Sequence, residues 1–256
     1  MRTGSWIMET KYLYVMGSES GVGKSTVCQG ILAQVLAWGY SSSQLAYIKP
    51  VTQCTEKQGI ALFCTRNHIA HTDIGDLVFR NGFTRDFIDG LTKSSDELMS
   101  AVLASIIDIG KGKALVVIDG VGDPAVGSVV GVSNVDVATA LPCSVIFVGK
   151  PGIGAAIDNT VLCVSFMQSK GVKNIGLIYN QIPTDQIFEA RKYVSKRIPE
   201  LLPNVILLGF TGKEDKIFAD PNDTAIARWF SDSVDEKTLL QDWLGLKKTR
   251  RKEIEP

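Results

Sequence analysis

The chain has 256 residues, enough for one large α/β domain or two small ones, and its hydrophobic content of 45% is that of a globular protein with a sizeable core. Its formal net charge is zero, so the overall balance gives no reason to expect nucleic acid or an acidic membrane surface as a partner. No apolar run reaches the length needed to span a membrane.

The first predicted elements are a strand, a turn and a helix. An apolar run predicts a buried strand over 12–16, and a glycine-rich turn covers 17–23. Apolar residues then recur at helical spacing from Val27 onward, which predicts a helix over 24–38. Strand, glycine-rich turn and helix in this order form the unit that binds nucleotide phosphates in many α/β proteins.

Strands and helices alternate along the rest of the chain. Further strands are predicted over 45–51, 114–118, 144–148, 174–179 and 205–208, and further helices over 58–66, 94–110, 134–141, 154–171, 184–198, 224–230 and 235–244. The helix over 94–110 begins with the spacing of a capping box, Ser94 to Glu97. The stretch 67–92 mixes acidic, glycine and aromatic residues, and we expect it to be irregular and to line a site.

This alternation predicts an α/β fold with a mainly parallel, doubly wound sheet. Together with the phosphate-binding unit over 12–38, it predicts a three-layer P-loop NTPase. No linker or repeat divides the chain, so we expect a single P-loop ATPase domain over 1–256, with flexible tails at 1–10 and 246–256. The basic cluster at 247–252 is interpreted as a solvated tail rather than an anion or partner contact.

The cysteines and the N-terminus bear on the compartment. Five widely spaced cysteines without a Cys-x-x-Cys pair favour reduced thiols over disulfides or a soft-metal site. Residues 1–10 lack the apolar core of a signal peptide. We therefore expect a cytoplasmic protein, or one of an organelle whose targeting signal cannot be read.

The glycine-rich turn supplies the predicted nucleotide site. Its backbone N–H groups and the helix N-terminus suit an anion, Lys24 adds a cation for the β- and γ-phosphates, and the Ser25 hydroxyl suits Mg²⁺. The predicted ATP-binding residues are Gly17, Ser20, Gly21, Val22, Gly23, Lys24, Ser25 and Thr26. Five residues separate Gly17 from Gly23, one more than the usual phosphate-loop spacing, and the alternative is a turn that only caps the helix.

Two charged residues lie at the carboxyl ends of predicted strands and complete the site. Lys49 is interpreted as a second catalytic cation beside Lys24, aimed at the γ-phosphate or a substrate carboxyl; the alternative is a solvated strand end. Asp119 is predicted to bind Mg²⁺ together with Ser25, against the alternative of a carboxylate that caps the next turn. Asp123 is a weaker candidate for the same role.

The histidine pair His68 and His71 lies near Asp73 and Asp76, which permits a metal cluster, but on a polar loop we favour exposed surface side chains. No Ser-His-Asp set is recognisable, and the aromatic and basic stretch 79–87 is too short for a nucleic-acid groove.

Together these stretches resemble the dethiobiotin synthetase family, within the wider group that also holds the synthetase domain of cobyrinic acid a,c-diamide synthase. The resemblance covers about residues 10–210. Residues 17–25 resemble the family's phosphate loop, including the longer spacing and the acidic third residue, and residues 47–51 resemble its Lys-Pro-Val strand end. Asp119 to Gly122 is similar to its Mg²⁺-binding Glu-Gly-Ala-Gly, and 154–160 with Asn180 is similar to its helix start and adenine-reading asparagine.

The chain departs from that pattern in three places. Asp119 replaces the family's glutamate, the family's Mg²⁺-binding aspartate has no counterpart that can be aligned between Thr52 and Asn67, and the loop 123–133 is unlike the family's substrate loop. The resemblance therefore implies the nucleotide half of the site more firmly than the diamine substrate.

The resemblance implies an ATP-dependent carbon–nitrogen ligase, a homodimer that uses Mg²⁺ and ATP to activate a small-molecule carboxylate or carbamate by γ-phosphoryl transfer. The alternatives are a MinD/ParA-type regulatory ATPase that dimerises around ATP and a degenerate protein that only binds nucleotide. A regulatory ATPase usually carries a lysine early in the loop, where this chain has Glu19.

Overall fold

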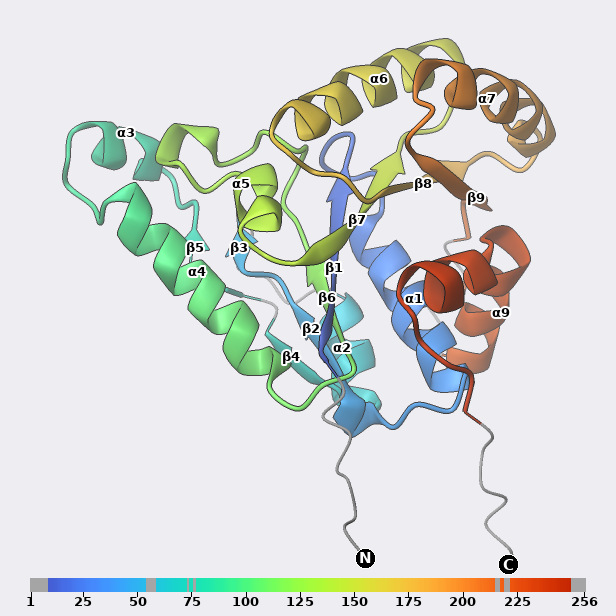
Figure 1. The fold of residues 1–256 in the computed structure, drawn as a ribbon, viewed down its shortest axis with the longest axis horizontal. Helices are drawn as coiled ribbons and strands as arrows, with labels where there is room; N and C mark the ends of the chain where they lie inside the picture. Colours follow the sequence, from blue (N-terminus) through green and yellow to red (C-terminus); the bar gives the residue numbers. More distant parts are fainter. Residues whose placement is uncertain are drawn as a thin grey trace, which may run out of the picture.

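The computed structural model describes residues 9–53, 59–72, 74–75, 77–214, 217–218 and 222–249. Its centre is a seven-stranded sheet with the order β4-β2-β6-β1-β7-β8-β9, in which every pair of neighbours is parallel. The strands are β1 (Lys11–Gly17), β2 (Leu45–Ile48), β4 (Ala70–Thr72), β6 (Leu115–Asp119), β7 (Cys143–Gly149), β8 (Ile175–Ile182) and β9 (Ile206–Gly212). The predicted α/β class with a parallel sheet is confirmed (Figure 1).

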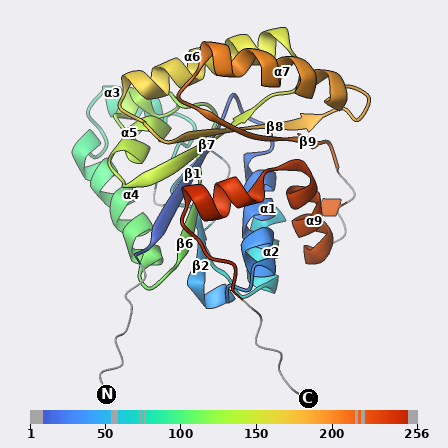
Figure 2. The same ribbon diagram turned by 45° about the vertical axis from the view of Figure 1, so that its right-hand side comes forward.

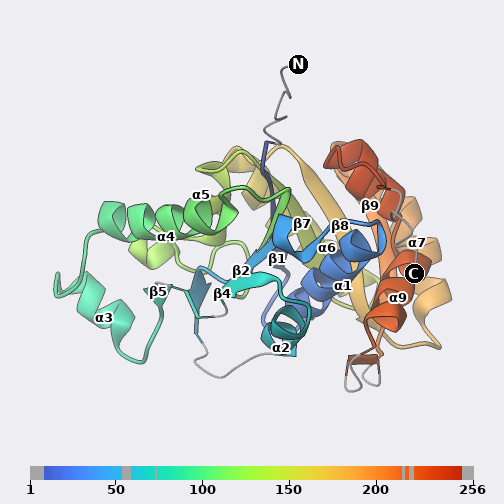
Figure 3. The ribbon, with the colours of Figure 1, turned by 90° about the horizontal axis from the view of Figure 1, so that it is seen from below.

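Helices cover both faces of the sheet. One face packs against α1 (Lys24–Ala37), α2 (Gly59–Arg66), α9 (Asp223–Ser233) and a π-helical turn, η3 (Lys237–Trp243). The other packs against α4 (Ser95–Gly110), α5 (Asn134–Thr139), α6 (Gly154–Ser169) and α7 (Ile187–Leu201). Seen from below, α4 and α5 lie on one side of β2, and α1 and α2 lie on the other (Figure 3). The chain therefore has the three layers that the alternating pattern predicts.

The residues of β1 show why the strand is buried on both sides. Leu13 and Val15 contribute to one hydrophobic core, whereas Tyr14 and Met16 contribute to the other. Successive side chains of a strand point to opposite faces, so an unbroken apolar run suits a strand in the middle layer. The phosphate loop, which follows β1, is thereby fixed to the centre of the sheet.

The stretch 67–92, expected to be irregular, contains ordered elements. It holds β4 at the sheet edge, β5 (Leu77–Val78) and α3 (Phe83–Ile88). The predicted strand 45–51 is also divided, because Pro50 separates β2 from β3 (Val51–Thr52), which pairs with β5 in a small second sheet. Of these elements, α3 lies beyond the outer end of α4 (Figure 1), whereas β5 lies beside α4, where Leu77 lines a cavity together with Leu98 and Val102.

Short helical turns complete the connections. The turn η1 (Ser42–Gln44) precedes β2, and η2 (Ser128–Val130) lies in the loop between β6 and α5. The capping box of α4 is present, since the Ser94 N–H donates to Glu97 Oε2 at 2.9 Å and the Ser94 side chain accepts from the Glu97 N–H. Helix α1 ends before Gly39, whose φ of 95° lies in the left-handed region that favours glycine.

The last described residues are packed rather than free. Residues 246–249, expected as part of a tail, return to the C-terminal end of α1, where the Thr249 N–H donates to the Trp38 carbonyl at 2.9 Å. Leu246 is only 4% exposed. This segment follows α9 and η3 on the same face of the sheet (Figure 2). Residues 250–252, the rest of the basic cluster, lie outside the described residues.

Candidate nucleotide-binding site

The phosphate loop runs from the end of β1 to the start of α1. Gly21 and Gly23 have φ values of 83° and 82°, in the left-handed region where a side chain is strained. The Ser18 N–H donates to the Val148 carbonyl at 2.9 Å, which ties the start of the loop to β7. The loop therefore has the curled backbone and the helix N-terminus that the sequence predicts for an anion cradle.

Lys24 lies over this loop. Its Nζ donates to the Glu19 carbonyl at 3.0 Å, and the side chain is buried. Burial lowers the pKa of the Lys24 ammonium from its ordinary value, and the neighbouring Asp119 carboxylate partly opposes that shift. A buried cation beside a loop carbonyl is suited to an anionic ligand, which would restore the solvation that the ammonium has lost.

Asp119 ends β6 beside the loop and gathers three side chains on one oxygen. Its Oδ2 accepts hydrogen bonds from Ser25 Oγ at 2.6 Å and Tyr47 OH at 2.9 Å, and Lys49 Nζ lies 3.8 Å away. Its Oδ1 is buried and has no hydrogen-bond partner among the described residues. The three site residues predicted at separate positions of the sequence, Ser25, Lys49 and Asp119, therefore meet at one point.

Tyr47 belongs to this site, although the motif over 47–51 predicts a role only for its lysine. It is fully buried in β2, and burial, followed by the charge of Asp119, holds the pKa of its hydroxyl well above the ordinary value. One signal was available: Tyr47 and Lys49 are two residues apart, so an extended chain directs both toward the same face. A buried tyrosine hydroxyl also requires a polar partner, and Asp119 is the one it finds.

A cavity of about 300 Å³ opens between the phosphate loop and the ends of β2 and β6. Lys24, Ser25 and Lys49 line it together with Thr52 and Gln53. The remaining lining residues are Ser20, Gly21, Gly23, Gly120, Val121 and Gly122. This is the carboxyl end of a parallel sheet at a change in strand order, where such folds bind their ligands.

The donor set fits a hard divalent cation. Ser25 supplies a hydroxyl oxygen, and Asp119 supplies a buried carboxylate oxygen without a hydrogen-bond partner in the described part of the chain. Oxygen donors are the ligands that Mg²⁺ takes, usually with waters and phosphate oxygens completing the shell. The predicted metal residues thus have suitable chemistry and lie close together.

Asn180 contacts the phosphate loop from β8. Its Nδ2 donates to the carbonyls of Val22 at 2.9 Å and Gly23 at 3.2 Å, and its Oδ1 accepts from Thr211 Oγ1 at 2.6 Å. A Cβ on Gly23 would meet the Asn180 Nδ2 far inside contact distance, so the glycine also admits this approach. Asn180 braces the phosphate loop from β8, and the adenine contact implied by the family resemblance stays a prediction.

The other residues in and next to the predicted loop pack against one another or pair with a neighbouring side chain. Val22 is buried, and Gly17 lies against it, since a Cβ on Gly17 would come within 2.7 Å of Val22 Cγ2. Thr26 is half-buried in the first turn of α1. The Glu19 carboxylate is half-exposed and lies 3.6 Å from Lys150 Nζ, which gives this acidic loop residue a cationic partner after β7.

The weaker candidates take local roles. Asp123 Oδ1 accepts from the Ala125 N–H at 2.8 Å and so caps a turn. His71 Nδ1 lies 3.0 Å from the Ile69 carbonyl, and His68 is exposed. Asp73 and Asp76 lie outside the described residues, and within the described part no cluster of His, Cys, Asp and Glu is suited to a metal. Cys28, Cys64, Cys143 and Cys163 are free thiols, as expected.

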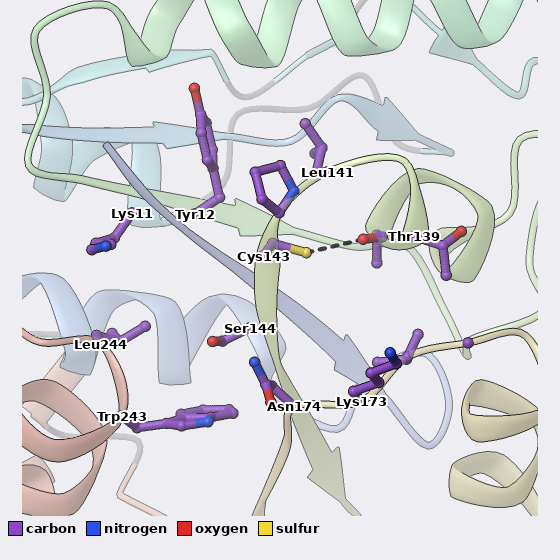
Figure 4. A pocket seen from close by; sticks show the side chains of 14 residues that line it. Lys11, Tyr12, Thr139, Leu141, Cys143, Ser144, Lys173, Asn174, Trp243 and Leu244 are labelled. Atoms are coloured by element: carbon purple, nitrogen blue, oxygen red, sulfur yellow. Dashed lines mark hydrogen bonds between the residues drawn. The ribbon is translucent and has the colours of Figure 1, made fainter. Parts of the chain in front are cut away.

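A second cavity, of about 400 Å³, lies at the opposite end of the strands. Figure 4 shows Tyr12, Ser144 and Trp243 around the start of β7. Lys11, one of its lining lysines, is already paired with Glu9 at 3.0 Å. Since this cavity contains none of the predicted site residues and lies at the amino end of the sheet, the cavity at the phosphate loop is the candidate nucleotide site.

A parallel seven-stranded sheet, with this loop at the end of its central strand and a carboxylate at the end of the adjacent strand, defines a P-loop NTPase. The family comparison gives the same class: residues 11–218 match the family model AAA_26, described as an AAA domain. The chain belongs to this family of P-loop ATPase domains, which lies in the dethiobiotin synthetase-like clan. No curated protein sequence matches the chain significantly.

Solved structures with a similar fold include ATPases of the MinD and McdA type. The MinC:MinD cell division protein complex of Aquifex aeolicus is 14% identical, with a TM-score of 0.54 over 87% of this chain and 95% of that chain. A complex of a Cyanothece McdA variant with ATP is 11% identical, with a TM-score of 0.54 over 94% of this chain and 99% of that chain. At these identities the likeness shows the fold. Among the described residues, no helix is both long and apolar enough to cross a membrane.

Proposed function

We propose that this P-loop ATPase hydrolyses MgATP at the cavity beside the phosphate loop. The observation that carries the proposal is the meeting of Ser25, Lys49 and Asp119 next to Lys24. In this arrangement the loop N–H groups and Lys24 hold the β- and γ-phosphates, and Lys49 neutralises charge that develops on the γ-phosphate. Mg²⁺, when bound by Ser25 and Asp119, would supply further charge neutralisation.

The test is phosphate release by the purified protein with MgATP, compared with a Lys24→Ala variant. We expect the variant to lose both nucleotide binding, measured by calorimetry, and phosphate release. Equal nucleotide affinity in the two proteins would contradict the assignment of the site. Binding without phosphate release by the unaltered protein would instead support the degenerate alternative, in which only the nucleotide site is retained.

Within the P-loop ATPases, the fold comparisons favour one more specific function, that of a regulatory ATPase that dimerises around ATP. MinD and McdA, the similar structures described above, are ParA-type ATPases rather than synthetases. One residue opposes it, because Glu19 lies where such ATPases usually carry a lysine. The reading requires ATP to change the oligomeric state, so sedimentation with a non-hydrolysable ATP analogue should show a dimer that ADP does not support.

A synthetase is the second candidate, and Lys49 is the observation that favours it. The cavity extends from the phosphate loop past Lys49 to Thr52 and Gln53, which leaves room beside the γ-phosphate for a carboxylate or carbamate. In that reaction the substrate oxygen attacks the γ-phosphorus, ADP leaves, and an amine then displaces phosphate from the acyl phosphate. ADP release that depends on a diamine together with bicarbonate, or on a polycarboxylate, would distinguish this reading from the regulatory one.

A further inference from the structure

Tyr47 and Asp119 approach each other across neighbouring strands. In the parallel pair of β2 and β6, Tyr47 lies opposite Val117, two residues before Asp119. The tyrosine ring must therefore run along the sheet toward its carboxyl end for the hydroxyl to reach Asp119 Oδ2 at 2.9 Å. This bond spans two strands within the buried layer, so packing on both sides fixes it.

The hydrogen bonds to Asp119 are unevenly divided between its two oxygens. Oδ2 accepts from both Ser25 and Tyr47, whereas Oδ1 accepts from no described residue although Asp119 is 0% exposed. A buried carboxylate oxygen without a partner is costly, and in native structures such an atom is usually paired with a protein group, an ordered water or an ion. A rotation of the carboxylate that exchanged its two oxygens would break both of these hydrogen bonds.

We propose that Tyr47 is a positioning residue for the divalent cation: its hydroxyl holds Asp119 Oδ2 and so reserves Oδ1 for Mg²⁺ or one of its waters. The inference rests on the proposed MgATP function and adds a residue to it. Tyr47 acts through Asp119, as the outer partners of metal ligands do, and loss of such a partner typically lowers metal affinity about 10- to 100-fold. A purely structural tyrosine would fill the core without affecting the cation.

Tyr47→Phe separates these two roles, because it keeps the buried ring and removes only the hydroxyl. Tyr179→Phe is the matched control: Tyr179 is also buried, in β8, and its hydroxyl lies 2.9 Å from Thr160 Oγ1, away from Asp119. The affinity of a non-hydrolysable ATP analogue is measured by calorimetry for each protein, once with Mg²⁺ and once with EDTA. The affinity of Mn²⁺ for the ADP complex, measured by electron paramagnetic resonance, gives a second readout.

We expect Tyr47→Phe to bind Mn²⁺ roughly tenfold more weakly, to lose affinity for the analogue with Mg²⁺, and to keep its affinity in EDTA. Excess Mg²⁺ should restore analogue binding, and the control should behave like the unaltered protein. Unchanged Mn²⁺ affinity in Tyr47→Phe would overturn the inference, as would an equal loss of analogue affinity in EDTA or the same effect in the control. An unaltered protein that binds no nucleotide, or binds it without regard to Mg²⁺, would instead contradict the proposed function itself.

Discussion

Lys24 combines a proposed role in nucleotide binding with a cost to folding. Burial lowers the pKa of its ammonium, so the charged form is less favourable in the folded protein than in the unfolded chain. Stability of the nucleotide-free protein is therefore reduced at every pH below the folded pKa, and it recovers as the pH rises from the folded pKa to the unfolded one. Residues held in this way for function are where stability and activity trade against each other.

Lys24→Met should therefore abolish nucleotide binding and raise the free energy of unfolding of the nucleotide-free protein by roughly 0.5–2 kcal/mol at neutral pH. Urea denaturation between about pH 7 and pH 10 measures the difference, which should shrink toward the alkaline end. Lys173→Met, an exposed position at the opposite end of the sheet, serves as the control. If Lys24→Met is less stable than the unaltered protein, then Lys24 stabilises the folded state and the prediction is wrong.

A second prediction concerns Asn180. Its loss should affect ATP and GTP binding equally if it braces the loop, but ATP binding alone if it contacts adenine. Asn180→Ala leaves two loop carbonyls and the Thr211 hydroxyl without this partner, which should cost roughly 1–3 kcal/mol of stability. We expect the affinities for ATP and GTP to fall by the same factor, measured by calorimetry. A selective loss of ATP affinity would instead support the adenine contact.

Among the elements, the pair α1 and α9 packs through a glycine. A Cβ on Gly30 of α1 would lie 2.6 Å from Phe230 Cδ2 and 3.1 Å from Trp229 Cζ3, both in α9. The two helices can approach this closely only because position 30 has no side chain. This contact places α9 against α1, the helix that follows the phosphate loop.

Gly30→Ala should destabilise the protein although alanine favours the helix by about 1 kcal/mol, because the overpacking costs roughly 1–3 kcal/mol. Gly154→Ala is the control, since no atom lies within 4 Å of a Cβ there at the start of α6. Urea denaturation of both variants measures the effect. If Gly30→Ala is as stable as the unaltered protein or more stable, then α9 can move away from α1 without loss of stability, which contradicts the prediction.

Element positions could be predicted from the sequence where periodicity was strong. The buried runs of β1, β6 and β7 and the capping box of α4 all lie where the pattern indicates. The stretch 67–92 could not be resolved, because β4 and β5 are two or three residues long and are ordered by strand pairing rather than by local pattern. Strand order likewise depends on contacts distant in sequence, which no local pattern encodes.

The residues of the candidate site could be predicted from the sequence only where a motif contains them. Lys24, Ser25, Lys49 and Asp119 could be named from their types and their places after strands, and the structure brings the last three together. Tyr47 and the bracing role of Asn180 could not, because each depends on which strands are neighbours. Residues 54–58, part of the stretch where a Mg²⁺-binding aspartate was sought, lie outside the described residues.

At the scale of the whole molecule, the segment 246–249 is joined to the end of α1. Leu246 is buried, the Lys247 N–H donates to Tyr40 OH at 3.0 Å, and the Thr249 N–H donates to the Trp38 carbonyl. This contact lies at the end of α1 opposite the phosphate loop, which precedes the first residue of that helix. Stability and nucleotide binding should therefore respond differently when the segment is removed.

A chain truncated after residue 245 should lose roughly 1.5–3 kcal/mol of stability, the value of one buried leucine side chain, and keep its affinity for ATP. A chain truncated after residue 249 is the control, because it retains these contacts. Thermal unfolding and calorimetry measure the two properties. Reduced ATP affinity in the shorter chain alone would show that the segment is coupled to the phosphate loop.

The order of the sheet also has a consequence for synthesis on the ribosome. The phosphate loop follows β1, but β1 has β6 and β7 as its neighbours, and the loop is braced by Asn180 from β8. A nascent chain that has reached only α4 lacks all three of these supports. If the loop binds a nucleotide as proposed, we expect that capacity to arise only once β8 has been made, although the loop itself is translated before β6, β7 and β8.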